Sequence, residues 1–90
     1  MDCKQGPVSK TYGGTSWLVY GCSDAHSLSL VTAPGSPASP FVFFFEWKVD
    51  GYHLAGVGTG KKSLTDAAFK EISAFSRTDI ESLVAETRRH

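Results

Sequence analysis

The segment 40–60, PFVFFFEWKVDGYHLAGVGTG, constrains the fold more than any other part of the 90-residue chain. Two runs of aromatic and aliphatic residues flank Asp50-Gly51, a dipeptide typical of a two-residue hairpin turn because both residues tolerate positive φ. This turn predicts a β-hairpin in which four pairs face each other: Val49 and Tyr52, Trp47 and Leu54, Phe45 and Gly56, and Phe43 and Gly58. One face of the first strand then carries four aromatic rings: Phe41, Phe43, Phe45 and Trp47.

Gly56 and Gly58 fall on this aromatic face of the hairpin. A glycine in a strand leaves room for an aromatic ring of the neighbouring strand, so both are predicted to be packing glycines. The stretch GVGTGKKS at 56–63 resembles a phosphate loop but does not fit one. Ala55 stands where the Walker A pattern needs its first glycine, and Lys62 stands at the Ser/Thr position. Nucleotide binding is therefore excluded.

Two more strands are predicted before the hairpin. TSWLVYGC at 15–22 is rich in β-branched and aromatic residues, and SLSLVT at 27–32 alternates as a half-buried strand does. The segment 33–40, APGSPASP, contains three prolines and is predicted to be a loop. Residues 1–14 are polar and broken by glycine and proline, so they are predicted to form a flexible N-terminal arm.

Two helices are predicted after the hairpin. Ser63 with Asp66, and Thr78 with Glu81, have the spacing of a capping box. An apolar stripe at helical spacing follows the first cap: Leu64, Ala68, Ile72 and Phe75. The pattern predicts an α+β fold for a single domain of residues 15–90. We expect a four-stranded antiparallel meander, β-β-β-β-α-α, with the two C-terminal helices packed on one face of the sheet.

Such helices cover only one face of the sheet, and the other face carries apolar residues as well. Val42, Phe44 and Val57 form a patch there that a small monomer rarely leaves in water. We therefore predict a non-catalytic interaction domain, a homodimer or a binder of another protein, that uses this face. The N-terminal arm or the residues flanking the hairpin are the alternative cover for the patch.

Charge and cysteine content limit the partners and leave the compartment open. Nine basic residues balance nine acidic ones, so no global field draws the chain to nucleic acid or to a membrane. No apolar run approaches the roughly 20 residues that span a bilayer. The first ten residues lack a hydrophobic segment, which fits a cytoplasmic protein or a secreted or periplasmic one whose signal peptide has been removed. Cys3 and Cys22 are either a disulfide or two free thiols.

The residues Cys22, Asp24 and His26 are of the types that make a nucleophile, an orienting acid and a base. Side chains this close in sequence diverge within one turn, and a turn around Asp24 is the preferred interpretation. Three scattered histidines do not have the spacing of a zinc site. We predict no catalytic residue, no metal site and no cofactor.

Residues 41–68 follow the pattern F-x6-K-V-D-G-Y-x3-G-x-G-x-G-K-K-x4-A-A. This pattern resembles the C-terminal half of double-stranded RNA-binding domains, where a hairpin leads through a glycine-rich turn to lysines at a helix start. The resemblance implies that Gly60, Lys61 and Lys62 contact RNA phosphates. It covers about a third of the chain, Thr65 stands where that family has a third lysine, and the segment 15–22 replaces the family's N-terminal helix. Double-stranded RNA binding is therefore the alternative function.

Overall fold

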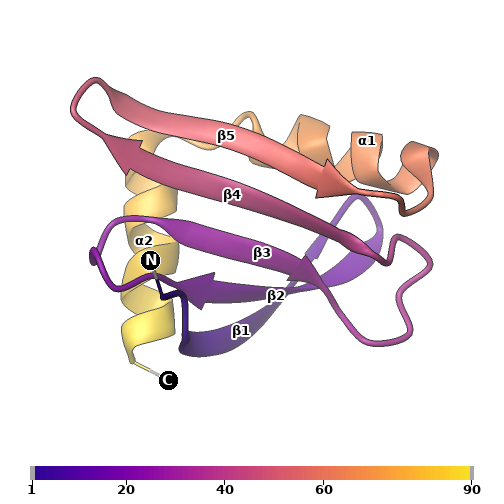
Figure 1. The fold of residues 1–90 in the computed structure, drawn as a ribbon, viewed down its shortest axis with the longest axis horizontal. Helices are drawn as coiled ribbons and strands as arrows, with labels where there is room; N and C mark the ends of the chain where they lie inside the picture. The colour runs from indigo at the N-terminus through magenta and orange to yellow at the C-terminus, as the bar shows by residue number, and fades with distance from the viewer. Residues whose placement is uncertain (1, 90) are drawn as a thin grey trace.

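The computed structural model describes residues 2–89, so Met1 of the predicted arm and His90 of the predicted domain lie outside the described residues. The elements follow in this order: β1 (Gln5–Tyr12), β2 (Thr15–Gly21), β3 (Leu28–Thr32), β4 (Phe41–Lys48), β5 (Gly51–Gly58), α1 (Lys62–Ile72) and α2 (Arg77–Arg88). The five strands form one antiparallel sheet in chain order. Both helices lie behind this sheet in the view of Figure 1.

The α+β class and the two C-terminal helices are as predicted, but the expected number of four strands is wrong. Residues 5–12, which the sequence placed in an arm, form β1 and pair with β2. The sequence pattern did not indicate this strand because Gly6 and Pro7 interrupt it. They lie at a shift of register between Gln5 and Val8. The signal for it is Gly13-Gly14, a hairpin dipeptide whose two residues have φ of 61° and 78°.

The core lies between the sheet and the helices. Trp17, Val19, Leu28 and Leu30 have no exposed surface, and Phe43 and Phe45 of β4 lie beside them. The helices complete the core with one face each: Ala68 and Ile72 from α1, and Ile80, Leu83 and Val84 from α2. Burial of this apolar surface is the main force that holds the helices against the sheet.

The β4–β5 hairpin forms, but its turn consists of Val49 and Asp50, and the predicted register is wrong by two residues. The observed pairs are Lys48 with Gly51, Trp47 with Tyr52, Phe45 with Leu54, Phe43 with Gly56 and Phe41 with Gly58. His53 Nε2 lies 2.8 Å from Asp50 Oδ1, which holds Asp50 in the turn. A shift of two residues keeps every side chain on its predicted face, because the strand repeats every two residues.

Gly56 and Gly58 pack against aromatic residues as predicted, with partners that follow from the observed register. A Cβ added to Gly56 would lie 2.8 Å from the Phe43 ring, and one added to Gly58 would lie 2.7 Å from the Phe41 Cα. Both distances are too short for a side chain. These glycines therefore allow the β4 rings to lie over β5.

Both helices begin two residues or less from their predicted caps, with different capping residues. Lys61 is the N-cap of α1, and no side chain caps that helix, so the predicted role of Ser63 is wrong. Thr59 and Gly60 both donate their amides to the Pro40 carbonyl, which fixes the chain just before α1 starts. In α2, Ser76 and Asp79 form the capping box, ahead of the predicted pair Thr78 and Glu81.

Candidate interaction face of the sheet

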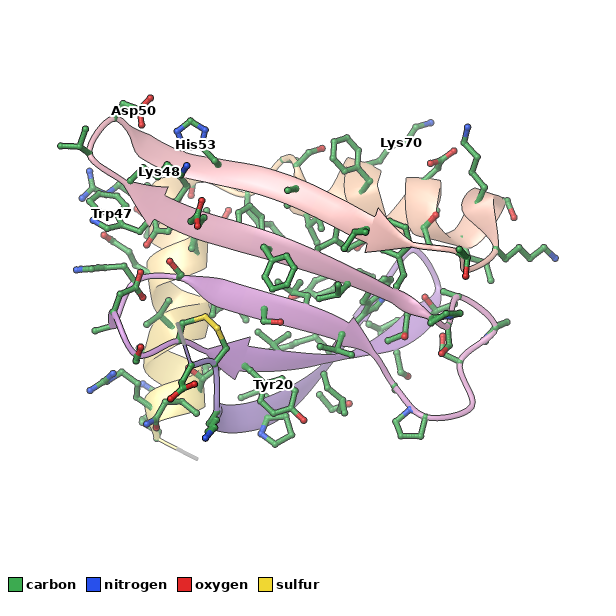
Figure 2. All side chains as sticks on the ribbon, in the orientation of Figure 1. Tyr20, Trp47, Lys48, Asp50, His53 and Lys70 are labelled. Carbon is green, nitrogen blue, oxygen red and sulfur yellow. A yellow bond between two sulfur atoms is a disulfide. The ribbon has the colours of Figure 1, made fainter. Side chains whose placement is uncertain are left out.

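The face of the sheet turned away from both helices is here called the outer face, and it points toward the viewer in Figures 1 and 2. Cross-strand pairing places its side chains in two rows. One row consists of Leu18, Val31, Val42 and Val57, and the next of Tyr20, Ser29, Phe44 and Ala55. Seven of these eight residues are apolar or aromatic. The outer face is therefore a continuous apolar surface from β2 to β5.

The three residues predicted for an interaction face, Val42, Phe44 and Val57, all lie on the outer face. Phe44 is 40% exposed and Val57 is 62% exposed, whereas Val42 is half-buried between its neighbours Val31 and Val57. The N-terminal segment does not cover them, because β1 extends the sheet at its far edge beside β2. Within residues 2–89, the apolar rows face solvent.

The charged residues of the outer face lie at its hairpin end. Glu46 pairs across the sheet with His53, and the Lys48 ammonium lies 3.2 Å from the Glu46 carboxylate. These charges are exposed and compensate one another. A partner of this face therefore meets an apolar surface without a strong field of either sign.

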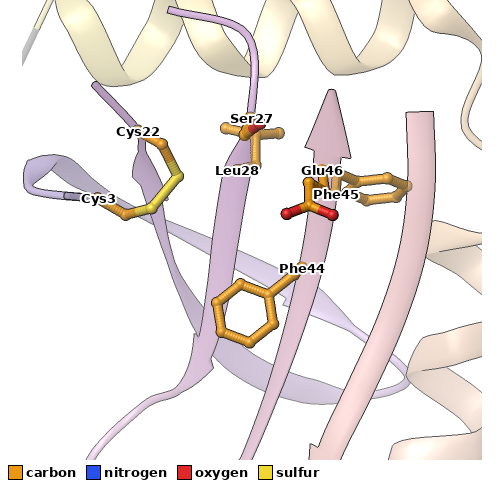
Figure 3. Close-up of a pocket in the computed structure, with 7 residues that line it drawn as sticks. All are labelled: Cys3, Cys22, Ser27, Leu28, Phe44, Phe45 and Glu46. Carbon is orange, nitrogen blue, oxygen red and sulfur yellow. A yellow bond between two sulfur atoms is a disulfide. The ribbon is translucent and has the colours of Figure 1, made fainter. Parts of the chain in front are cut away.

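A hollow of about 280 Å³ opens on the outer face beside Phe44 (Figure 3). The Cys3–Cys22 disulfide lies on one side of it and the Phe44 ring on another, with the Glu46 carboxylate close by. Ser27, Leu28 and Phe45 complete its lining. The hollow is apolar, with one acidic group, and its volume is close to the roughly 300 Å³ at which small ligand pockets begin.

Cys3 and Cys22 form a disulfide, one of the two states that the sequence left open. It joins the residues before β1 to the end of β2, where Cys22 is buried. Ser23 also donates its amide to the Asp2 carbonyl beside it. The disulfide therefore fixes one wall of the hollow.

The trio of Cys22, Asp24 and His26 forms the predicted turn. The Cys22 sulfur is bonded to Cys3 and offers no thiolate, and the His26 ring lies 5.2 Å from that of Trp47. Burial by itself raises the pKa of Asp24, but hydrogen bonds from the Ser27 hydroxyl and from the Ser27 and His26 amides outweigh it and lower that pKa. These contacts give the carboxylate of Asp24 a structural role in closing the turn.

Gly60, Lys61 and Lys62 lie together between β5 and the first turn of α1. The Gly60 amide donates to Pro40, and a Cβ on Gly60 would collide with the Ala38 carbonyl, so close packing accounts for this glycine. Both lysines are exposed. Arg77 lies at the opposite end of the sheet, with its guanidinium 4.7 Å from the Trp47 ring and bonded to Glu81. The lysine pair and Arg77 are therefore separate basic groups.

Comparison of the chain with models of protein families, with curated proteins and with solved structures finds no match. Neither helix within residues 2–89 is long and apolar enough to cross a membrane.

Proposed function

We propose that this chain is a non-catalytic interaction domain that binds a protein, another copy of itself or a different chain, through the outer face of its sheet. The observation that carries the proposal is the pair of apolar rows from β2 to β5, which the described residues leave in water. Exposed patches of this kind in small proteins mark interaction surfaces.

The size of the outer face suits a stable interface. The molecule measures 31 by 27 Å along its two longer axes, and the sheet spreads across them in Figure 1. A standard interface buries about 800 Å² on each partner, which a face of these dimensions can supply.

The hollow beside Phe44 supplies the feature that gives such a face its affinity. Binding energy in an interface concentrates where an anchor side chain fills a pocket near its centre. The disulfide and the Phe44 ring offer apolar contact to such an anchor. A partner that inserts a leucine or an aromatic ring here, surrounded by further apolar side chains, matches this chemistry.

A photo-crosslinking residue placed on the outer face tests the proposal in the cells that make the protein. The residue replaces Phe44 on the outer face or, as a control, Val49 in the hairpin turn, which is fully exposed. We expect position 44 to give an adduct of one discrete mass and position 49 to give none. Equal yields from both positions, or no adduct at position 44, would reject the proposal.

Double-stranded RNA binding through Lys61 and Lys62 is the second proposal, supported by the two adjacent, exposed lysines at the start of α1. Contacts with phosphate weaken steeply as salt rises. We expect binding of a short RNA duplex at low salt that Lys61→Ala with Lys62→Ala abolishes. Arg88→Ala with Arg89→Ala is the matched control, since these two exposed cations lie at the end of α2. Absence of binding at low salt would end this alternative.

A further inference from the structure

The sheet has two edges, and β1 is protected from pairing with further strands. Pro7 and the register shift between Gln5 and Val8 interrupt β1. The Lys10 ammonium bonds to Glu86 of α2 at 3.0 Å, which ties the helix to this edge. Proline, irregular register and a covering helix are the usual devices that keep an edge strand from pairing.

The other edge, β5, lacks the proline and the irregular register of β1. Its eight residues, GYHLAGVG, include no proline and no Lys, Arg, Asp or Glu, and they pair with β4 without a shift. Thr59 donates its amide to Pro40 on the β4 side, and alternate residues of an antiparallel strand point to the same neighbour. The amides and carbonyls of Tyr52, Leu54, Gly56 and Gly58 are therefore directed away from β4.

Apolar side chains flank the β5 edge on both sides of the sheet. Val57 lies on the outer face, and Phe69 of α1, 46% exposed, lies on the helix side. The Phe69 ring is 6.2 Å from that of Phe43, which pairs across the sheet with Gly56. In Figure 1 the ribbon of α1 extends past β5, beyond the edge of the sheet. A sixth strand at this edge would cover both Val57 and Phe69.

We infer that the sixth strand is β5 of a second copy, paired antiparallel about a twofold axis that passes Ala55. This register alone brings all four outward-directed residues of each β5 into the ladder: Leu54 faces Gly56 of the second copy, and Tyr52 faces its Gly58. Each bulky side chain then lies opposite a glycine, a combination that stabilises glycine in strands. Ala55 faces Ala55, and His53 faces Val57 of the second copy.

The chemistry of the strand favours a second copy over a different chain. Two copies repel little, because the chain has no net charge and β5 carries no Lys, Arg, Asp or Glu. The bulky residues 52 and 54 and the glycines 56 and 58 are arranged symmetrically about Ala55, so the strand is complementary to itself. Closed twofold pairing also uses up the free edge, which leaves none for further growth.

The β5 pairing is independent of binding through the outer face. It joins the sheets of two copies edge to edge, so their two outer faces form one surface on the same side. Either proposal can therefore fail without the other.

Cysteine scanning along β5 tests the inferred register. Facing residues that are not hydrogen-bonded to each other lie about 4.5 Å apart at Cα, within the range for a disulfide. We expect Ala55→Cys to give a covalent dimer in a glutathione buffer. His53→Cys and Val57→Cys should each give no covalent dimer alone and should cross-link when mixed. If Val57→Cys alone cross-links as fast as Ala55→Cys, the inferred register is overturned.

Sedimentation of the unmodified chain, with two matched variants, tests the dimer itself. We expect Phe69→Ser to weaken dimerisation at least tenfold and Phe44→Ser to change it less than twofold, since the Phe44 ring is directed from β4 toward the disulfide side, away from β5 (Figure 3). Circular dichroism verifies that both variants fold. A chain that stays monomeric to millimolar concentration overturns the pairing. An adduct at position 44 with a different protein would still support the outer-face proposal in that case.

Discussion

The two faces of β4 carry similar apolar residues, but one face packs in the core and the other is open to solvent. Phe43 and Phe45 point toward the helices and are almost fully buried, whereas Val42 and Phe44 point the other way and stay accessible. A strand covered on one side normally alternates apolar with polar residues. The unbroken run FVFFF departs from that rule. The inward residues stabilise the fold. The outward apolar residues stay accessible to solvent, and for this reason we infer a partner.

The largest expected effect comes from truncating the inward face. Phe45→Ala leaves a cavity next to Phe75 and Leu28, and we expect the free energy of unfolding to fall by about 3–5 kcal/mol. Phe44→Ala, one residue away on the outer face, should cost less than about 1 kcal/mol because that ring is partly in water. Urea denaturation of both variants measures the difference. Equal losses would show that the two faces contribute alike.

The second largest effect on stability is expected from the Cys3–Cys22 disulfide, which lies beside the outer face. Replacing Cys3 and Cys22 by serine opens a loop with a sequence separation of 19, and we expect a loss of about 3 kcal/mol. Thermal unfolding with and without a reducing agent provides the measurement. The reductant should shift the wild-type midpoint and leave that of the double variant unchanged. A wild-type midpoint that ignores the reductant would contradict the expectation.

Alkaline pH should lower the free energy of unfolding through Tyr12, which lies in the core. Burial, together with the Glu86 and Glu71 carboxylates, raises the pKa of Tyr12 to about 12. In the unfolded chain this phenol ionises near pH 10, so its contribution is fully present below pH 10 and is lost as pH rises toward 12. We expect a loss of about 2–3 kcal/mol over this window that Tyr12→Phe abolishes. Denaturant titrations at pH 8 and pH 11.5 measure it, and an equal loss in the variant would assign it to another group.

The smallest expected effect on stability belongs to the lysine pair. Lys61 and Lys62 are exposed, and no side chain caps the helix they begin. Their replacement by alanine should change the free energy of unfolding by less than about 0.5 kcal/mol. A larger loss in denaturant titration would give these lysines a structural role and weaken the case for a phosphate contact.

Features encoded over short distances were predictable, and those that depend on distant partners were not. The hairpin and the faces of its residues follow from a period of two. The apolar stripe of α1 follows in the same way from a helical period. The observed turn, Val49-Asp50 in place of Asp50-Gly51, sets Gly56 against Phe43 and Gly58 against Phe41, contacts that the dipeptide pattern does not reveal. The start of α1 depends on the Pro40 carbonyl, more than twenty residues earlier in the chain.

The residues of the candidate surfaces were likewise predictable where they follow from a local pattern and not where they depend on strand pairing. Val42, Phe44 and Val57 were predictable because a register error of two residues preserves the face of a strand. Tyr20, Leu18 and Val31 extend the outer face, and their inclusion required the pairing of β2 with β3 and of β3 with β4. The edge position of β5 follows from the predicted meander. The set of its amides and carbonyls that is free could not be predicted, because a turn at Asp50-Gly51 would direct the other half of them outward.

The disulfide also decides how the domain carries mechanical load. A pull on residue 2 passes through the Cys3–Cys22 bond directly to the end of β2, so residues 4–21 bear no tension while the bond is intact. Stretching the oxidised chain by its ends will load the α2 end and the β2–β3 connection first. The hairpin of β1 and β2 will add its length to the extended chain only after reduction.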